Sequence, residues 1–287
     1  MILLSQYMDT LKPSLYEYLD YRQYLRDLYT SLNKKEERRF FSLRYFSRAA
    51  GFSSPNYLKL VMDGARNLTQ KSIRKFSRAL KLDSEETEFF ENLVYMNQSP
   101  STEEKNHYYA KLSQSQPYLE AKGLEKDQYE YFTQWYYAVI REMILMPHFR
   151  ENPQWIADQL VPKITGREAA QAIELLVRLG LLRRDPQGRL EQAERNITSG
   201  EIVRHLALCN FHRSMMQRAQ ESIDAIPGEE RDISAITIAI HTAKVPELKK
   251  KMAEFRKEVH ALLGDEKGPN AVYQINFQVF RLTKISS

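Results

Sequence analysis

Apolar residues recur every three or four positions along most of this chain, which is the spacing of amphipathic helices. Residues 42–82 contain three such helices in succession. Gly51 separates the first helix from the second and Gly64 ends the second, because glycine adopts the conformations of helix ends at little cost. The apolar positions of the three helices are Leu43, Phe46 and Ala50, then Tyr57, Leu60 and Val61, and then Ile73, Phe76, Leu80 and Leu82.

Polar residues mark where these helices begin. Ser53 or Ser54 is predicted to cap the second helix, and Pro55 suits its first turn, where a backbone N–H has no helical partner. Thr69 is predicted to cap the third helix. Two short helices about a glycine turn, followed by a third helix, resemble the lambda-repressor-like helix-turn-helix, whose second helix enters the major groove of DNA.

This resemblance implies two sets of DNA contacts. Side chains on the polar side of the second helix are expected to read bases, namely Ser53, Ser54, Asn56 and Lys59. Residues that flank this helix are expected to contact phosphates, namely Arg44, Arg48, Arg66, Asn67, Lys71 and Arg74. Leu58 and Met62 lie where such helices often carry polar residues, so we expect them to contact thymine methyl groups or to pack against protein.

The charge of the chain is concentrated in the same stretch. Residues 34–81 contain 13 Lys and Arg residues against 3 acidic residues, a net charge of +10. The whole chain carries +5, so the remaining residues sum to −5. Neutralising phosphates releases counterions and supplies most non-specific DNA affinity. This distribution favours DNA binding over a purely structural helical hairpin.

Further helices are predicted to complete a small N-terminal domain, residues 1–98. Residues 16–32 form an amphipathic helix that braces the motif, and the charged residues 34–39 connect the two. Asp83 and Glu86 form a capping box that starts a fifth helix through Met96.

A linker, residues 99–125, follows this domain. Pro100 and its polar neighbours break the helical pattern. One helix is predicted from Thr102 to about Leu112, and residues 113–117 are the looser part of the linker.

The next segment, residues 126–196, resembles a winged helix. An aromatic-rich helix is predicted over residues 129–146 and a short one over 152–160. A third helix begins at a capping box formed by Thr165 and Glu168, and a two-stranded hairpin follows it around residues 181–190.

Acidic side chains on the last of these helices disfavour a DNA-reading role for it. Glu168 and Glu174 would face phosphates of like charge. We therefore expect a structural or interface role for the winged-helix region. Its remaining candidates for DNA contact are Arg167, Arg178, Arg183, Arg184 and Arg189.

The C-terminal residues 197–287 are predicted to be an α/β region for dimerisation or effector binding. Ser199 caps a long helix to about Ile226. Residues 233–240 and 271–283 alternate as strands do, on either side of a helix from Pro246 to Leu263. The two strands fit a parallel crossover or an antiparallel pair. The expected fold class is thus mainly α, with at least these two strands in addition to the hairpin.

Five short motifs carry a further resemblance. They are Tyr16 with Asp20, Tyr21, Arg22, Tyr24 and Leu25; Ala50 to Ser54; Gly64 with Arg66, Asn67 and Leu68; Arg231 to Ser234; and Val272 to Asn276. Together they resemble a family of uncharacterised bacterial proteins, regarded as transcriptional regulators with an N-terminal lambda-repressor-like helix-turn-helix and a conserved C-terminal domain. This family often occurs as many paralogues in predatory and fibre-degrading species. Its ending usually reads Phe-Pro-Leu-Thr, whereas residues 280–283 here have arginine, which leaves the last strand able to pair further.

Other chemistry finds little support in the sequence. No phosphate-binding glycine loop, nucleophile elbow or pair of carboxylates stands out, so we expect neither an enzyme nor a cofactor. His205, Cys209 and His212 lie on one helix face and are weak metal candidates, since ligands at i and i+7 lie about 10 Å apart.

The expected compartment is the cytoplasm. The chain has one cysteine, which excludes an internal disulfide, and it lacks a run of about 20 apolar residues that would cross a membrane. An initial apolar run of only four residues is too short for a signal peptide.

Two functional classes fit these observations. The first is a sequence-specific regulator of transcription that binds double-stranded DNA as a homodimer and uses its C-terminal part to dimerise or to sense a small-molecule or protein effector. The second is a non-enzymatic, antitoxin-like scaffold whose helix-turn-helix binds protein. DNA binding weakens steeply with salt, whereas an apolar interface does not.

Overall fold

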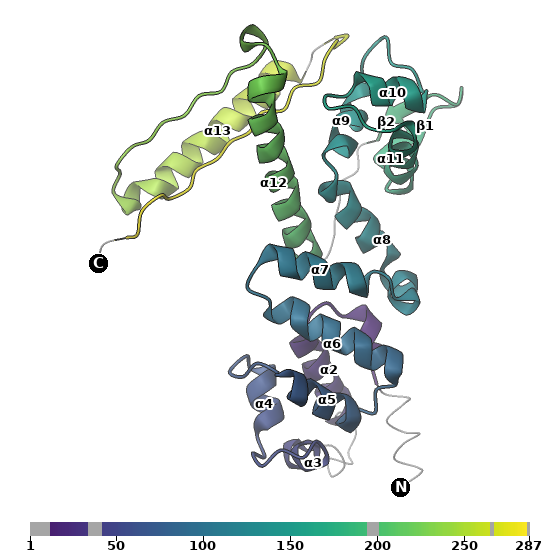
Figure 1. Ribbon diagram of the computed structural model, residues 1–287, viewed down its shortest axis with the longest axis vertical. Helices are drawn as coiled ribbons and strands as arrows, with labels where there is room; N and C mark the ends of the chain where they lie inside the picture. Colours follow the sequence, from purple (N-terminus) through teal and green to yellow (C-terminus); the bar gives the residue numbers. More distant parts are fainter. Residues whose placement is uncertain (1–11, 34–41, 194–200, 265–266, 286–287) are drawn as a thin grey trace. The chain divides into compact units, whose positions relative to one another are not determined.

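The computed structural model describes residues 12–33, 42–193, 201–264 and 267–285. The chain is mainly helical, with one small antiparallel sheet, as the sequence predicts (Figure 1). It forms two compact units, Met1–Lys126 with Ser199–Leu206, and Asp127–Thr198 with Ala207–Ser287. Within the described residues, no helix has both the length and the apolar character needed to cross a membrane.

The first unit contains the predicted helix-turn-helix and the helices around it. Thr69 caps its helix by accepting from the Ser72 N–H, and Asp83 and Glu86 form a complete capping box, so both predicted helix starts are confirmed. The elements are η1 (Leu15–Glu17), α2 (Tyr21–Asn33), α3 (Leu43–Ala49), α4 (Tyr57–Met62), α5 (Gln70–Ala79), α6 (Ser84–Gln98), α7 (Thr102–Leu112) and the first part of α8 (Gln116–Thr133), whose residues from Asp127 on belong to the second unit. The charged connector 34–39 lies outside the described residues.

The region predicted to be a loose linker is largely helical. Helix α7 matches the prediction, but α8 begins at Gln116 inside the stretch expected to be loose. Tyr118 explains the difference, because it is fully buried and its ring packs against Tyr109 of α7. Burial of a large aromatic side chain stabilises a helix that a polar local sequence does not predict.

The second unit contains the predicted helices and hairpin of the winged-helix region. Thr165 and Glu168 form the predicted capping box. Strands β1 (Leu182–Arg184) and β2 (Leu190–Gln192) pair antiparallel, with Leu182 opposite Gln192, which confirms the hairpin. The helices are α9 (Trp135–Met143), α10 (Pro153–Gln159) and α11 (Gly166–Arg178), and all three contribute to one apolar core.

One predicted helix of this unit is two helices. The aromatic stretch 129–146 is interrupted at Gln134, whose backbone is extended, so that α8 ends at Thr133 and α9 begins at Trp135. The break allows Tyr131 and Tyr137 to stack in the core with ring centroids 6.4 Å apart. Packing of these rings therefore overrides the continuous helical spacing.

The prediction of C-terminal strands is wrong for the chain as described. Residues 233–240 and 271–283 are extended, but neither forms a ladder with another segment. A strand exists only through a hydrogen-bonded neighbour, and these two segments each run along helix α13 (Val245–Leu263) instead of pairing (Figure 1). The other elements of the C-terminal region are α12 (Glu201–Ala225), η2 (Gly228–Glu230) and η3 (Thr242–Lys244). Ser199, the predicted cap of the long helix, lies outside the described residues.

Candidate nucleic-acid interface

The turn between α3 and α4 is held by hydrogen bonds to its backbone and contains the predicted glycine. Gly51 has φ +67°, a left-handed conformation that favours glycine. The Phe52 N–H then donates to the Ser47 carbonyl at 2.8 Å, and the Ser47 hydroxyl donates to the Pro55 carbonyl at 3.1 Å. The Lys75 ammonium donates to the Gly51 carbonyl at 2.7 Å, which ties the turn to α5.

Four aromatic rings hold this turn against α5. Phe76, fully buried, packs edge-on against Phe46 at 4.9 Å and against Phe52 at 5.7 Å between ring centroids. Phe52 also stacks on Tyr57 at 4.0 Å with the two planes 9° apart. The turn and the first residue of α4 are therefore fixed by side chains from three elements.

The exposed face of α4 differs from the sequence prediction. Leu58, Val61 and Met62 are the buried positions, so of the two alternatives for Leu58 and Met62 the structure favours packing against protein over contact with thymine methyl groups. The helix begins at Tyr57 after Asn56, later than predicted, and neither Ser53 nor Ser54 is its cap residue. Leu58, Val61 and Met62 thus face the domain core, because the stacking of Tyr57 on Phe52 fixes the rotation of α4.

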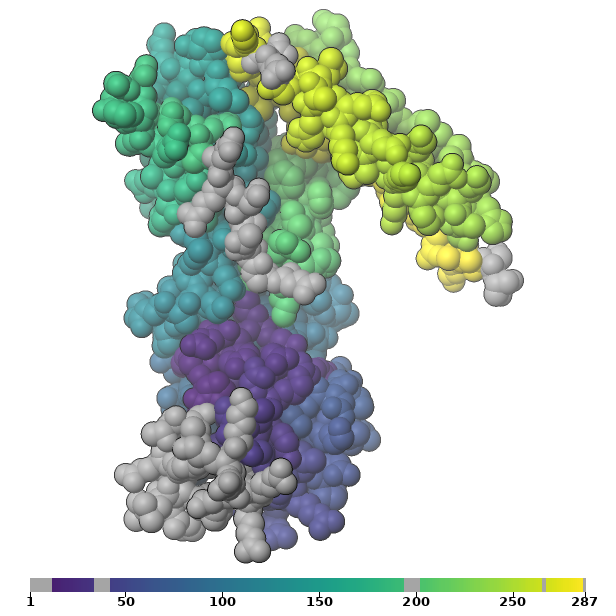
Figure 2. All heavy atoms as spheres, turned by 180° about the vertical axis from the view of Figure 1, so that it is seen from behind, coloured from purple at the N-terminus to yellow at the C-terminus, as the bar shows by residue number. Residues whose placement is uncertain are grey.

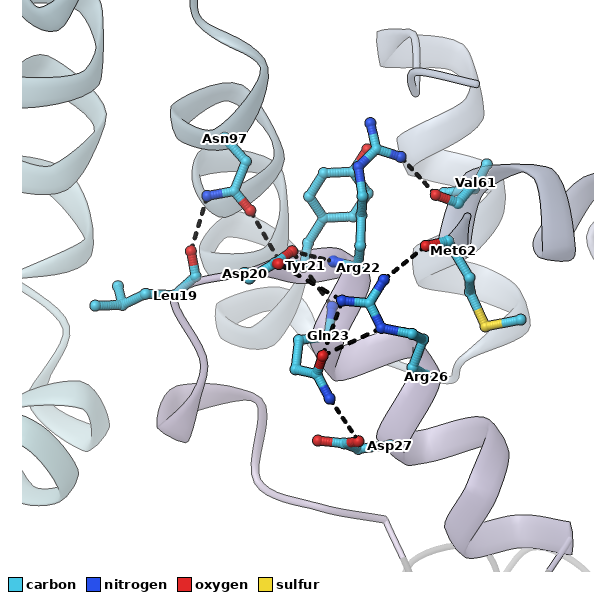
Figure 3. Close-up of polar contacts among 10 residues, drawn as sticks. All are labelled: Leu19, Asp20, Tyr21, Arg22, Gln23, Arg26, Asp27, Val61, Met62 and Asn97. Atoms are coloured by element: carbon cyan, nitrogen blue, oxygen red, sulfur yellow. Dashed lines mark hydrogen bonds and ion pairs between the residues drawn. The ribbon is translucent and has the colours of Figure 1, made fainter. Parts of the chain in front are cut away.

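Two arginines of α2 hold the C-terminal end of α4 (Figure 3). The Arg22 guanidinium donates to the carbonyl of Val61, to that of Arg66 at 3.0 Å and to Asn67 Oδ1 at 2.7 Å. Arg26 donates to the Met62 carbonyl at 2.6 Å. The last carbonyls of a helix have no partner within it, so these bonds satisfy them and fix the direction of α4.

Helix α6 holds the start of α2, the helix that carries Arg22, and the segment that follows α4. Asn97 caps the start of α2, because its Oδ1 accepts from the Tyr21 N–H at 2.9 Å and its Nδ2 donates to the Leu19 carbonyl at 2.8 Å (Figure 3). Gln98 bonds both backbone groups of Leu68, at 2.7 and 2.9 Å, and accepts from the Tyr21 hydroxyl at 2.9 Å. Burial raises the pKa of Tyr21 to about 12, so this hydroxyl stays protonated and donates.

Sequence reasoning missed these supporting residues. Helical spacing predicts which residues face a core, but it carries no sign that Arg22, Arg26, Asn97 and Gln98 serve backbone groups of another element. The one sequence feature that points to any of these four residues is the family motif that contains Tyr21 and Arg22.

The predicted base-reading residues lie at the start and on the outer side of α4. Ser53, Asn56 and Lys59 are exposed and Ser54 is half-buried. Asn56 occupies the cap position without a side-chain cap bond, so its amide is available to a ligand. Lys59 forms an ion pair with Asp63 at 2.8 Å, which partly neutralises it.

The predicted phosphate contacts are exposed. They lie on the elements next to α4 in the chain, namely α3, the loop after α4, and α5. Arg44 and Arg48 lie one turn apart on α3, Arg66 and Asn67 follow α4, and Lys71 and Arg74 lie on the outer side of α5. Arg78, one turn beyond Arg74, extends this row. Within the described residues, none of the five arginines nor Lys71 forms an ion pair. We call these six side chains, Arg44, Arg48, Arg66, Lys71, Arg74 and Arg78, the basic set.

One family model matches the chain. Residues 115–282 match the family described as "Domain of unknown function (DUF4423)". The chain belongs to this family. Neither the search of curated proteins nor that of solved structures found a significant match. The DUF4423 region begins after the helix-turn-helix and includes α8 to α13.

Arginines of the DUF4423 region contrast with the basic set. Four of the five that the sequence singles out form ion pairs, whereas Arg167 forms none within the described residues. The pairs are Arg178 with Asp127 at 2.6 Å, Arg183 with Glu191 at 2.5 Å, Arg184 with Glu151 at 2.6 Å and Arg189 with Asp185 at 2.8 Å. Charges already matched by carboxylates offer little to phosphates. Four of these five arginines therefore offer less free positive charge than the basic set does.

The weak metal candidates lie along α12 of the DUF4423 region. His205 and His212 are exposed and Cys209 is half-buried. Across the described ranges, no three His, Cys, Asp or Glu side chains are arranged to hold a metal ion.

Proposed function

We propose that this protein is a cytoplasmic, sequence-specific regulator of transcription that binds double-stranded DNA through α4. The observation that carries the proposal is the basic set, six exposed cations around one fixed helix that form no ion pair within the described residues. Exposed cations without carboxylate partners repel one another. A phosphate backbone relieves that repulsion and releases counterions.

In this proposal α4 enters the major groove, with Asn56 and Lys59 toward base edges. The arginine and amide contacts behind it keep the helix in one orientation, which base reading requires. The DUF4423 region serves dimerisation and effector binding, and two copies read two half-sites about one helical turn apart.

Neutralising the basic set tests the phosphate contacts. Lys71→Gln and Arg74→Gln should each weaken binding to all DNA sequences and reduce the salt slope by about one unit. Arg183→Gln, which removes an exposed arginine paired with Glu191, is the matched control and should leave both quantities unchanged. Fluorescence anisotropy over a salt series measures them. An unchanged slope in Lys71→Gln and Arg74→Gln would contradict the assignment.

Asn56→Ala tests base reading. Because Asn56 makes no side-chain cap bond, its loss should cost the fold little, whereas one base contact is worth about 1–3 kcal/mol of discrimination. Selection from random duplexes, followed by competition binding, measures the preference. Gln70→Ala, an exposed amide at the start of α5, is the control. If Asn56→Ala keeps the same preferred sequence and the same discrimination, α4 does not read bases through this residue.

The alternative function is a scaffold that binds protein through the helix-turn-helix. The same salt series distinguishes it from DNA binding. An apolar protein contact weakens little with salt. Absence of salt-dependent binding to any duplex would favour the scaffold.

A further inference from the structure

The C-terminal arm exposes an unusual amount of apolar surface. We define the arm as residues 231–240, helix α13 and residues 271–283. Figure 2 shows these segments packed together as one body, coloured light green to yellow. Yet α13 has no buried residue, and Ile236, Tyr273 and Leu262 are 85%, 73% and 79% exposed.

The two extended segments also leave their backbone unpaired. Within the described residues, neither segment takes part in a backbone–backbone hydrogen bond. Side chains anchor the second segment: Asn276 donates to the Met215 carbonyl at 3.0 Å, and Phe277 packs edge-on against Phe255 of α13 at 5.9 Å. Apart from the Ile275 carbonyl, which accepts from the Gln274 side chain at 3.3 Å, each segment presents N–H and C=O groups that make no backbone hydrogen bond within the described residues, the template on which another strand pairs.

The composition of these segments suits pairing. Exposed edges in monomeric proteins usually carry lysine, proline or inward charges that prevent association. Residues 233–240 read ISAITIAI and residues 271–280 read AVYQINFQVF, without a charge or a proline between them. β-branched and aromatic residues favour strands, so the sequence predicts strands that the single chain does not pair.

We propose that a second copy of this chain completes the sheet, with residues 233–240 and 271–283 of the two arms pairing reciprocally. Residues 233–240 and 271–280 carry no charge, so two copies related by a two-fold axis can pair over them without like charges opposite one another, and Arg281 lies near the end of the second segment. The exposed apolar side chains of one arm amount to on the order of 1,000 Å², against about 800 Å² per partner in a standard stable interface. One arm is thus large enough for a dimer. The inference names the dimer surface of the proposed regulator but does not depend on DNA binding.

Charged substitutions at the exposed strand positions test this interface in the full chain. Ile236→Lys and Tyr273→Lys alter side chains that are 85% and 73% exposed, so the single chain should fold as before. Because each change occurs twice in a two-fold dimer, the dissociation constant should rise about 100-fold or more. Light scattering over a concentration series, without DNA, measures it, and circular dichroism checks helical content. Leu145→Lys, 51% exposed outside the arm, is the control and should leave the dimer intact.

Hydrogen exchange distinguishes strand pairing from a mere apolar contact. Amides of residues 233–240 and 271–283 should exchange slowly at concentrations where the dimer forms and quickly where it dissociates. A wild-type monomer at all concentrations, or a dimer unaffected by both lysine variants, would overturn the interface. A dimer whose arm amides exchange freely would overturn the pairing. Neither result would affect binding of one α4 to a half-site, so failure of the dimer and failure of DNA binding are distinguishable.

Discussion

Replacing Phe76 with alanine is expected to lower the free energy of unfolding of the helix-turn-helix by about 3–5 kcal/mol. Phe76 is fully buried and its ring contacts Phe46, Phe52 and Tyr57, so its loss leaves a cavity lined by three rigid rings. Domains of this size are stable by about 5–15 kcal/mol in total. The variant should therefore lose much of its stability and, with it, any DNA binding through α4.

The position of the tryptophans makes this effect measurable unit by unit. Trp135 and Trp155, the two tryptophans of the chain, both lie in the second unit. The urea midpoint measured by tryptophan fluorescence should therefore be the same in Phe76→Ala as in the wild type. Circular dichroism should show loss of helix at a lower urea concentration in the variant. Tyr45→Ala, a half-exposed aromatic of α3, is the control and should cost at most about 1 kcal/mol. A single coincident transition in Phe76→Ala, unchanged from the wild type, would contradict the cavity argument.

The second large effect is expected at Arg22. Arg22→Met removes the donors of two backbone carbonyls and one amide oxygen at the end of α4. The part-buried Val61 carbonyl keeps the Gly64 N–H at 3.1 Å but loses a hydrogen bond from a charged donor, a kind of bond worth about 1.5–3 kcal/mol. Helix α4 should lose its fixed direction, so that DNA affinity falls by about tenfold or more even though Arg22 lies behind the helix.

Conservative variants separate positioning from charge. Arg22→Lys keeps the charge but cannot serve three acceptors from one planar fork, so it should bind DNA almost as poorly as Arg22→Met while keeping the wild-type salt slope. Arg26, which makes one bond to α4, should tolerate lysine better. Anisotropy titrations of the four variants, each changed at one of these arginines to lysine or methionine, provide the comparison. Full recovery of affinity in Arg22→Lys would show that only the charge at this position matters.

Comparison of the basic set with the paired arginines shows what charge counting alone misses. The sequence indicates an excess of positive charge in residues 34–81, but it cannot tell which arginines are neutralised. Arg184 meets Glu151 from 33 positions away, and Arg178 meets Asp127 from 51 positions away. Only the fold brings such partners together, and within the described residues it leaves the basic set without them.

What the sequence determined by itself was local. The caps at Thr69, Asp83 and Thr165 and the hairpin at residues 182–192 depend on hydrogen bonds within a few positions, so short patterns predict them reliably. The rotation of α4 was decided by tertiary structure, because Phe76 of α5 and Arg22 of α2 contact it from distant positions in the chain. The C-terminal strands show the same division: residues 233–240 and 271–283 have the side chains of strands, but a strand needs a distant partner for its backbone. Within the described chain that partner is absent, because each segment runs along α13 rather than beside another extended segment.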